Sequence, residues 1–427
     1  MTTKTKNIMG RKGIIDFILL ASGSTLGQGM AIIFAPILSR VYTEGQLGTY
    51  TLILTAVGMF ESAICLRYDL ILVSEKNGLR IRSLAFSCMR IAFLLAALIT
   101  IGYTGYLVAT SQLSWTNAWL GAFVFPALVC ASIILILTAI NNRSSQYKNI
   151  ALASLTQGVV HNGLSALLGI FHTTGVLGLI AGRIAGYVSY IFVAKRTSAV
   201  RALKTQPLLP LKERIRTLEE NKRQAIFSTP AVIISCWAYS IINLFISQLY
   251  GIEMLGLYSY SYRLLGLPLA VISANISRMF FRDASNEYQN KFTMKRSFLK
   301  MLIPVAMISV VMVIGFQLYA PTVFSLVLGE RWREAGVFVQ ILAPMYGVRL
   351  LSNSFTNATI VVNKQFISLV LQVIYLIATT TLFIVCKTNS LDIYYFLKIM
   401  NTMFCAIYIV YFVVLASICL KIKKVDE

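Results

Sequence analysis

The stretch SRVYTEGQLGTY at residues 39–50 returns without a gap as SQLYGIEMLGLY at residues 247–258. Both copies carry the same residue at five positions: Ser39/Ser247, Tyr42/Tyr250, Leu47/Leu255, Gly48/Gly256 and Tyr50/Tyr258. Coincidence in an apolar-rich chain is one explanation, and internal duplication is the one that we favour. Each copy follows one apolar run and precedes another. The repeat therefore predicts the turn between the first two helices of each half.

The composition is that of a protein that crosses a membrane several times. Of 427 residues, 57% are hydrophobic and 13% are charged, and the mean hydropathy is +0.74. A soluble protein carries about 25% charged residues. Apolar runs of about 20 residues, long enough to cross roughly 30 Å of hydrocarbon, recur along the chain. The sequence predicts an all-α polytopic membrane protein.

The apolar runs predict about twelve transmembrane helices in two sets of six. The first set is 14–37, 47–66, 84–109, 116–140, 150–171 and 174–194; the second is 225–249, 255–277, 298–319, 336–362, 366–386 and 393–420. The predicted domains are an N-terminal six-helix bundle (1–194), a basic cytoplasmic linker (195–224) and a C-terminal six-helix bundle (225–427). Because six is even, both halves point the same way. Such repeats are related by a pseudo-two-fold axis along the membrane normal, with the substrate site where they meet.

The linker between the two sets combines many basic residues with Pro207 and Pro210, and its segment 211–220 has the composition of a helix. The whole chain has a formal net charge of +22. In a soluble protein this charge would indicate a nucleic-acid partner, but lysine and arginine also gather in the cytoplasmic loops of membrane proteins. Most of them fall in alternate breaks, which predicts cytoplasmic termini and no nucleic-acid partner. The seven cysteines show no paired metal spacing and are read as packing residues.

Three arginines, Arg183, Arg263 and Arg349, fall near the middle of predicted spans. Each costs roughly 2.5–3.5 kcal/mol to insert, so each is expected to face a cavity or a partner. One explanation is a buried ion pair that locks helices together. However, Glu61 is the only comparably deep acid, and one acid cannot neutralise three guanidiniums. We therefore expect a net positive cavity that binds substrate.

The residues around these arginines fit a polar lining. Arg349, Asn353 and Asn357 recur every four residues, which places them on one helix face with Tyr346. Arg183 lies within a glycine stripe, Gly178-x3-Gly182-x3-Gly186, that is typical of close helix packing. Arginine stays charged and binds phosphate oxygens bidentately, so the expected substrate is an anion. A phosphate or diphosphate lipid is the first candidate, and acidic sugars also qualify.

Two features suggest ion coupling or bending, each with a simpler alternative. Arg67 and Asp69 in the sequence Arg-Tyr-Asp, with Glu61 in the span before them, are candidates for ion coupling, and a helix-end ion pair is the alternative for Arg67 and Asp69. Pro36 predicts bending of the first helix, because proline removes a hydrogen bond from the helix. A static kink explains it equally well.

Several stretches resemble a known family. Gln28, Pro36-Ile-Leu-Ser-Arg-Val-Tyr42 and Leu47-Gly48-x-Tyr50, followed by Leu66-Arg-Tyr-Asp69, resemble the start of the polysaccharide-biosynthesis flippases. Arg278-Met-Phe-Phe-Arg-Asp-Ala-Ser285 is similar to the segment after the eighth helix of that family. These are the O-antigen repeat-unit (Wzx-type) translocases of the superfamily that also holds MATE exporters and lipid II flippases. The motifs are degenerate and say nothing about the sugar.

The resemblance implies a bacterial inner-membrane flippase. It would move undecaprenyl-diphosphate-linked oligosaccharide repeat units from the cytoplasmic to the periplasmic leaflet by alternating access. The implied partners are this lipid-linked oligosaccharide, membrane lipid and other polysaccharide-assembly proteins. By analogy, a proton or sodium gradient drives transport, with Glu61 and Asp69 as candidate ion carriers. No metal and no other cofactor is expected.

Other functions are weaker. A MATE-type drug exporter is the runner-up, but a positive cavity disfavours cationic drugs. A membrane glycosyltransferase or polymerase would need acidic residues on a substantial external loop, and Glu330 and Glu334 lie in a short one. An ATP-driven pump is excluded for this chain alone, because it has no G-x-x-x-x-G-K-[ST] phosphate loop. A scaffolding role would not explain arginines at mid-membrane. We therefore expect a carrier and not an enzyme.

Overall fold

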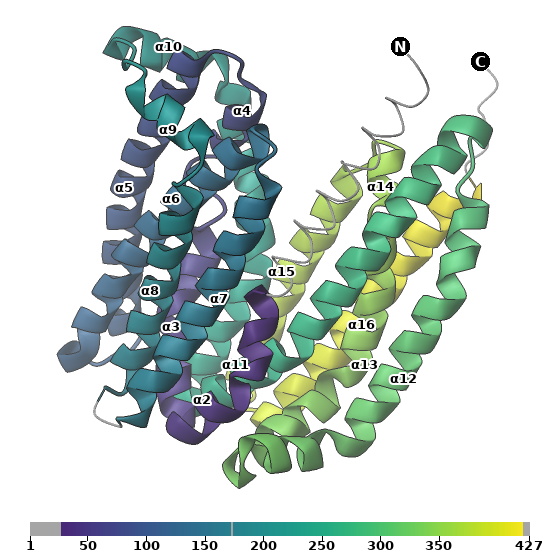
Figure 1. Cartoon of the computed structure of the whole chain (residues 1–427). Coiled ribbons are helices and arrows are strands. Elements are labelled where there is room, and N and C mark those ends of the chain that lie inside the picture. The colour runs from purple at the N-terminus through teal and green to yellow at the C-terminus, as the bar shows by residue number, and fades with distance from the viewer. Residues whose placement is uncertain (1–26, 172–173, 422–427) are drawn as a thin grey trace. The chain divides into compact units, whose positions relative to one another are not determined.

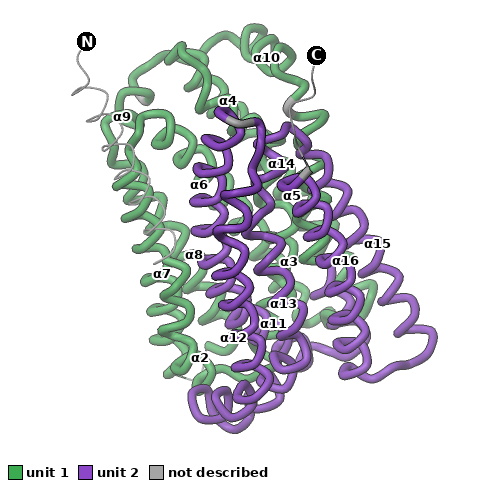
Figure 2. Tube along the Cα trace, turned by 90° about the vertical axis from the view of Figure 1, so that its right-hand side faces the viewer, with its two compact units in different colours: residues 1–240 green, residues 241–427 purple. Residues whose placement is uncertain are grey.

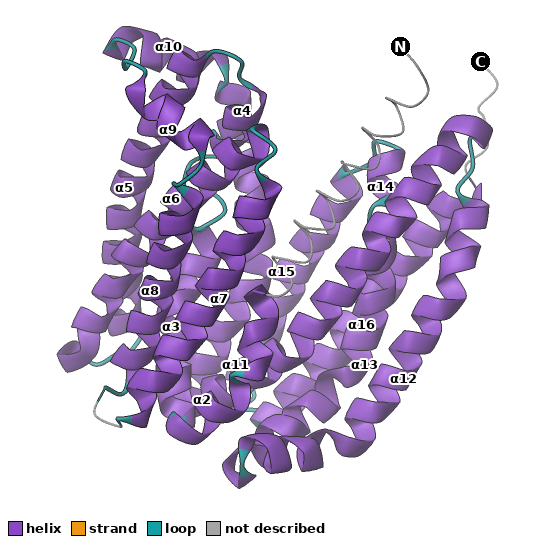
Figure 3. Ribbon diagram, viewed as in Figure 1, coloured by secondary structure: helices purple, strands orange, loops and turns teal. Residues whose placement is uncertain are grey.

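The computed structural model describes residues 27–171 and 174–421, and this part of the chain is built of helices joined by short turns, without a strand (Figures 1 and 3). The predicted basic N-terminus, most of the first span and the last tail residues lie outside the described residues. Eight helices of the described part are long and apolar enough to cross a membrane. One of them, α11 (Thr229–Lys291), contains two predicted spans. The prediction of an all-α polytopic membrane protein is confirmed.

The chain forms two compact units, residues 1–240 and residues 241–427 (Figure 2). The boundary between them falls inside α11, after the predicted linker. The finer division into two bundles and a linker at 195–224 stays a prediction.

Unit 1 contains the helices of the first predicted set. They are α2 (Ala35–Val41), α3 (Glu44–Phe60), α4 (Asp69–Ser74), α5 (Gly78–Ala109), α6 (Val124–Arg143), α7 (Tyr147–Ile170), α8 (Val176–Ala194), α9 (Ser198–Thr205), α10 (Leu211–Glu220) and the start of α11. A 3-10 helix, Trp115–Phe123, precedes α6. The most extensive helix contact is between α7 and α8, and α6 packs on both α5 and α8.

Unit 2 contains the remainder of α11 and the last helices. They are α12 (Lys295–Leu328), α13 (Arg333–Phe355), α14 (Ala358–Val361), α15 (Phe366–Thr388) and α16 (Ile393–Lys421). The centre of this unit is α13, which packs on α12 and on α16. The 18-residue apolar window of the α13 segment is 61% buried, against 11% for that of α12. Residues on α13 are therefore surrounded by protein, whereas α12 exposes most of its apolar surface to the membrane.

The repeated stretch forms a turn in both units. In unit 1, Thr43 caps α3: its hydroxyl accepts from Gln46 N–H, and the Gln46 side chain accepts from Thr43 N–H. The corresponding residue of unit 2 is Gly251, where α11 is interrupted by a backbone φ of 88° that favours glycine. Of the five shared pairs, four are buried in both units and Tyr250 is half-buried. The predicted turn is confirmed at the same place in both copies.

The second predicted span ends earlier than hydropathy suggests. Helix α3 stops at Phe60, and residues 61–68 form successive turns before α4 begins at Asp69. Leu66 and Arg67 have φ values of 49° and 60°, which non-glycine residues seldom adopt. Glu61 therefore lies at the end of a helix and not in the middle of one, as predicted. Hydropathy misses this break because the apolar run continues to Leu66.

The first helix is interrupted where Pro36 predicts bending. A turn at Phe34 separates helical residues 27–33 from α2, and Pro36 lies in the first turn of α2. Proline is tolerated at this position because the first N–H groups of a helix have no partner within it. The interruption is a feature of this one conformation and does not by itself establish movement.

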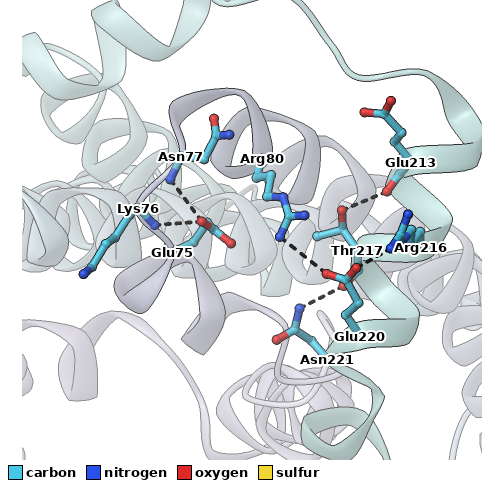
Figure 4. Close-up of polar contacts among 9 residues, drawn as sticks. All are labelled: Glu75, Lys76, Asn77, Arg80, Glu213, Arg216, Thr217, Glu220 and Asn221. Carbon is cyan, nitrogen blue, oxygen red and sulfur yellow. Dashed lines mark hydrogen bonds and ion pairs between the residues drawn. The ribbon is translucent and has the colours of Figure 1, made fainter.

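The linker segment of unit 1 folds against the end of α5. The predicted helix at 211–220 is confirmed as α10. On its buried side, Leu209 N–H donates to the Ser83 hydroxyl at 3.0 Å, and the carbonyl of Leu218 accepts from Tyr68 OH at 3.3 Å. On its exposed side, Glu220 pairs with Arg80 at 3.4 Å and with Arg216 at 3.2 Å (Figure 4).

Removing these two kinds of contact is expected to have unequal effects. Glu220→Gln breaks two exposed ion pairs and should lower the unfolding free energy by less than about 1 kcal/mol. Ser83→Ala leaves the Leu209 N–H without its buried acceptor and should cost about 1–3 kcal/mol. Thermal melting of the purified variants in detergent measures both. A larger loss for Glu220→Gln would contradict this account of the linker.

Candidate functional site

A pocket of about 320 Å³ lies in unit 2, between the second part of α11 and α13. Its lining residues are Tyr262, Arg263, Gly266, Leu267, Leu269, Ala270 and Ser273 from α11, and Tyr346, Arg349, Leu350 and Asn353 from α13. Three of the five predicted substrate-binding residues, Arg263, Arg349 and Asn353, are thus brought together. The structure places them on two helices of one unit.

Helical spacing explains which residues line the pocket. On α11, Tyr262, Gly266, Ala270 and Ser273 follow one another at intervals of three or four residues, so they share a face. On α13, Tyr346, Arg349 and Asn353 do the same. Gly266 carries no side chain, which leaves room between the two rows. The pocket is therefore formed by two facing stripes.

Tyrosine rings surround the arginine of α13. Arg349 Nη1 donates a long hydrogen bond of 3.5 Å to the hydroxyl oxygen of Tyr262. Its guanidinium carbon lies 5.7 Å from the centroid of the Tyr346 ring, within cation–π range. The rings of Tyr262 and Tyr346 meet edge to face at 6.0 Å. These contacts orient the guanidinium and leave its positive charge unneutralised by the tyrosines.

The pocket lining is positively charged. It includes two arginines, and no aspartate or glutamate is among the residues of the described chain that line it. Guanidiniums stay protonated, so both charges persist at any physiological pH. In a low-dielectric protein interior such charges attract an anion far more strongly than they do in water. The pocket is suited to a negatively charged group.

Buried polar contacts fix the segment of α13 that carries these residues. Pro344 opens the helix here, because its ring clashes with the preceding turn and it has no N–H. The next residue, Met345, donates its N–H to Asn401 Oδ1 of α16 at 2.9 Å. One turn on, the carbonyl of Gly347 accepts from the Ser309 hydroxyl of α12 at 2.6 Å. Helices α12 and α16 therefore position Tyr346 and Arg349 from behind.

Asn401→Leu should destabilise unit 2 through this contact. Leucine leaves the Met345 N–H without an acceptor inside the bundle, which costs about 1–3 kcal/mol. Thr402→Val is the matched control, since Thr402 is exposed and its hydroxyl bonds only to its own helix at Lys398. Thermal melting in detergent should separate the two variants. Equal melting temperatures would show that Asn401 does not support α13.

The stripe predicted on α13 is shorter than expected. Asn357 does not line the pocket, because α13 ends at Phe355 and Asn357 precedes α14. Its side-chain amide donates instead to the carbonyl of Ser277 on α11 at 3.2 Å. A spacing of four residues predicts a shared face only while the helix continues. Asn357 ties the end of the helix to α11.

The third predicted arginine, Arg183, belongs to unit 1. Its Nη2 donates to the Tyr187 hydroxyl at 2.8 Å, one turn later on α8, and its guanidinium carbon lies 4.6 Å from the centre of that ring. Glu61 is close enough to interact with it electrostatically. Nearby, the Tyr50 hydroxyl is 3.1 Å from His161 Nε2. Arg183 thus has a tyrosine and an acid as neighbours within its own unit.

The glycine stripe beside Arg183 packs α8 directly on α7. A Cβ atom added at Gly182 would collide with Ser165 Oγ and the carbonyl of His161. One added at Gly186 would collide with His161 Cβ. The close packing predicted from this spacing is confirmed.

The Arg-Tyr-Asp sequence lies in the break between α3 and α4. Arg67 Nη1 is 4.0 Å from Asp69 Oδ2 and donates a long bond of 3.5 Å to the carbonyl of Ser62. Burial raises the pKa of the Asp69 carboxyl above its ordinary value, and the Arg67 guanidinium opposes that shift. Asp69 is 6% exposed, and its Oδ1 has no hydrogen-bond partner in the described chain. The two residues are adjacent at the start of α4, and Glu61 lies at the end of α3.

The sequence analysis misses three polar or small lining residues, Tyr262, Gly266 and Ser273. The signal was present, since they recur along α11 at helical spacing beside Arg263. The leucines of the pocket gave no such signal, because leucine is common on every face of a membrane helix.

Solved transporters share this fold. The lipid II flippase MurJ in an inward closed conformation matches with a TM-score of 0.70 and 13% identity, over 94% of this chain and 87% of that one. A multidrug resistance MATE family transporter of the MOP superfamily, in an inward-facing conformation, matches with a TM-score of 0.63 and 14% identity, over 94% and 97% of the two chains. The expected MATE-like fold is confirmed.

Sequence comparison identifies the family. The teichuronic acid biosynthesis protein TuaB of Bacillus subtilis (strain 168) is 29% identical over 109 residues, or 25% of this chain. The alignments span 22% and 55% of the lengths of the two curated relatives that this chain matches. A family model described as polysaccharide biosynthesis protein matches residues 118–337, just over half of the chain. The chain belongs to the polysaccharide biosynthesis protein family.

Proposed function

We propose that this protein is a flippase for undecaprenyl-diphosphate-linked oligosaccharide repeat units. It moves them from the cytoplasmic to the periplasmic leaflet of a bacterial inner membrane by alternating access, with both of its termini in the cytoplasm. Family membership supports a role in polysaccharide biosynthesis, and the multi-pass fold supports transport. On this proposal the protein is a carrier and has no catalytic residues.

The observation that carries the proposal is the charge of the unit 2 pocket. Arg263 and Arg349 line it together, with Asn353 beside them and no acid in the lining that the structure describes. A diphosphate offers oxygens at the spacing that a guanidinium fork prefers. Arg183 in unit 1 is a further candidate for the same anion. The sign of the charge disfavours the runner-up, a MATE-type exporter of cationic drugs.

Coupling to a proton or sodium gradient is part of this proposal. Glu61 and Asp69 flank the break between α3 and α4 and are the candidate carriers. The raised pKa of Asp69 supports proton exchange nearer neutral pH than is usual for an aspartate. The Arg67 neighbour is equally consistent with a helix-end ion pair, which predicts no role in transport.

Deletion of the gene in its native host tests the proposal. Lipid-linked repeat units should accumulate in the cytoplasmic leaflet while surface polysaccharide is lost, and the intact gene should reverse both effects. Sensitivity to cationic dyes should not change. Normal surface polysaccharide in the deletion strain, or a changed dye sensitivity as its only defect, would refute the assignment.

A further inference from the structure

The unit 2 pocket has two chemically different parts. One part is polar, with Arg263, Arg349 and Asn353 beside the two tyrosines. The other part is aliphatic and is formed by Gly266, Leu267, Leu269, Ala270 and Leu350. A ligand that fills the pocket must therefore be amphipathic over a short distance.

The polar part demands negative charge. Two guanidiniums in one lining repel each other, and a neutral ligand leaves that repulsion in place. A phosphate or diphosphate relieves it and accepts several hydrogen bonds at once. Sugar hydroxyls alone therefore match this part poorly.

The aliphatic part demands hydrocarbon. Its leucine and alanine side chains have no hydrogen-bond donors or acceptors, so a sugar ring placed against them would lose hydrogen bonds to water without replacement. A hydrocarbon chain gains free energy by leaving water for the same surface. The pocket therefore favours a chain over a glycan on this side.

The size of the pocket sets how much of such a ligand enters. A volume of about 320 Å³ holds about ten water-sized groups. This matches a diphosphate with the first carbons of the attached chain. Several linked sugar rings do not fit.

We propose that the pocket binds the junction between a diphosphate and an apolar chain, so that the start of the lipid enters together with its phosphates. This rests on the proposed function and specifies which part of the substrate the pocket takes. The oligosaccharide lies outside the pocket. Recognition is therefore independent of the sugar sequence at this site.

Binding of sugar-free ligands to the purified full-length protein in detergent tests the inference. The probes are farnesyl diphosphate, inorganic diphosphate and farnesol, measured by titration calorimetry. Farnesyl diphosphate should bind at least about tenfold more tightly than inorganic diphosphate, because it also buries hydrocarbon. Farnesol should bind more weakly than farnesyl diphosphate by a similar factor. Equal affinities for farnesyl and inorganic diphosphate would overturn the inference.

A pair of substitutions on α11 localises the effect. Leu267→Asn should weaken farnesyl diphosphate by about tenfold and change inorganic diphosphate by less than about twofold. Leu264→Asn is the matched control, since Leu264 is half-buried on the same helix and does not line the pocket. It should change neither affinity. An equal loss for both ligands in Leu267→Asn, at unchanged melting temperature, would place the chain elsewhere.

Failure of this inference can be told apart from failure of the proposed function. If the gene restores repeat-unit translocation in the deletion strain but farnesyl and inorganic diphosphate bind alike, the flippase assignment stands and the junction site is wrong. If translocation does not depend on the gene, the proposed function itself is wrong, whatever the pocket binds.

Discussion

Arg349→Ala is expected to abolish restoration of surface polysaccharide in a strain that lacks the gene. The substitution removes one of two positive charges from the unit 2 pocket and leaves a space against Tyr346. A hydrogen bond to a charged group contributes about 1.5–3 kcal/mol, so substrate binding should weaken by about 10- to 100-fold. Polysaccharide on the cell surface, measured in strains matched for protein level, reports the effect.

Lysine at position 349 should restore the function only in part. It keeps the charge but replaces the planar fork with a single ammonium group, which cannot bind two phosphate oxygens side by side. The order of activity should therefore be arginine, then lysine, then alanine. Full activity with lysine would mean that charge alone matters at this position.

Arg333→Ala is the matched control on the same helix. Arg333 begins α13, its side chain is 67% exposed, and it pairs with Glu330 at the surface. Its removal should leave surface polysaccharide at the level of the unchanged protein. Wild-type polysaccharide in Arg349→Ala would show that this pocket does not bind the substrate.

Much of this pocket follows from the cost of burying charge. Arg263 and Arg349 were identifiable because an arginine inside an apolar run must find a cavity or a partner. Asn353 followed from helical spacing to Arg349. The same spacing failed for Asn357, because sequence alone does not show that α13 ends at Phe355. Periodicity predicts faces, whereas helix ends depend on local contacts.

The break between α3 and α4 shows a different limit. Residues 63–66 are Ala-Ile-Cys-Leu, which are apolar enough to continue a membrane helix. The chain nevertheless turns there, and Tyr68 and Asp69 are buried against other parts of unit 1. Tertiary contacts of this kind outweigh the apolar pattern. A single sequence gives no signal for the resulting backbone of Leu66 and Arg67.

Gly182→Leu is expected to prevent stable folding of unit 1. Gly182 lies where α8 meets α7, and even a single added carbon would collide with Ser165 and with the backbone of His161. Backbone atoms cannot move aside without separating the helices. Overpacking by small groups costs about 1–3 kcal/mol, and leucine adds several carbons. The protein should fail to accumulate in the membrane, as judged by immunoblotting of membrane fractions.

Gly105→Leu on α5 is the control for this substitution. A Cβ at Gly105 meets no atom within 4 Å, so the same side chain should be tolerated there. The milder pair, Gly182→Ala and Gly105→Ala, measures the packing term. Replacing glycine with alanine favours the helix by about 1 kcal/mol at either position, so that contribution cancels in the comparison. Gly182→Ala should melt at a lower temperature than Gly105→Ala.

The consequence for Arg183 follows from helix geometry. Adjacent residues of a helix point about 100° apart, so the face that Gly182 presses against α7 differs from the direction of Arg183. Tyr187, four residues on, lies on the same side as Arg183 and receives its hydrogen bond. The glycine contact therefore fixes α8 and so holds the Arg183–Tyr187 pair in place. If Gly182→Ala melts like Gly105→Ala, the contact between α7 and α8 is loose, and the position of Arg183 is set by other residues.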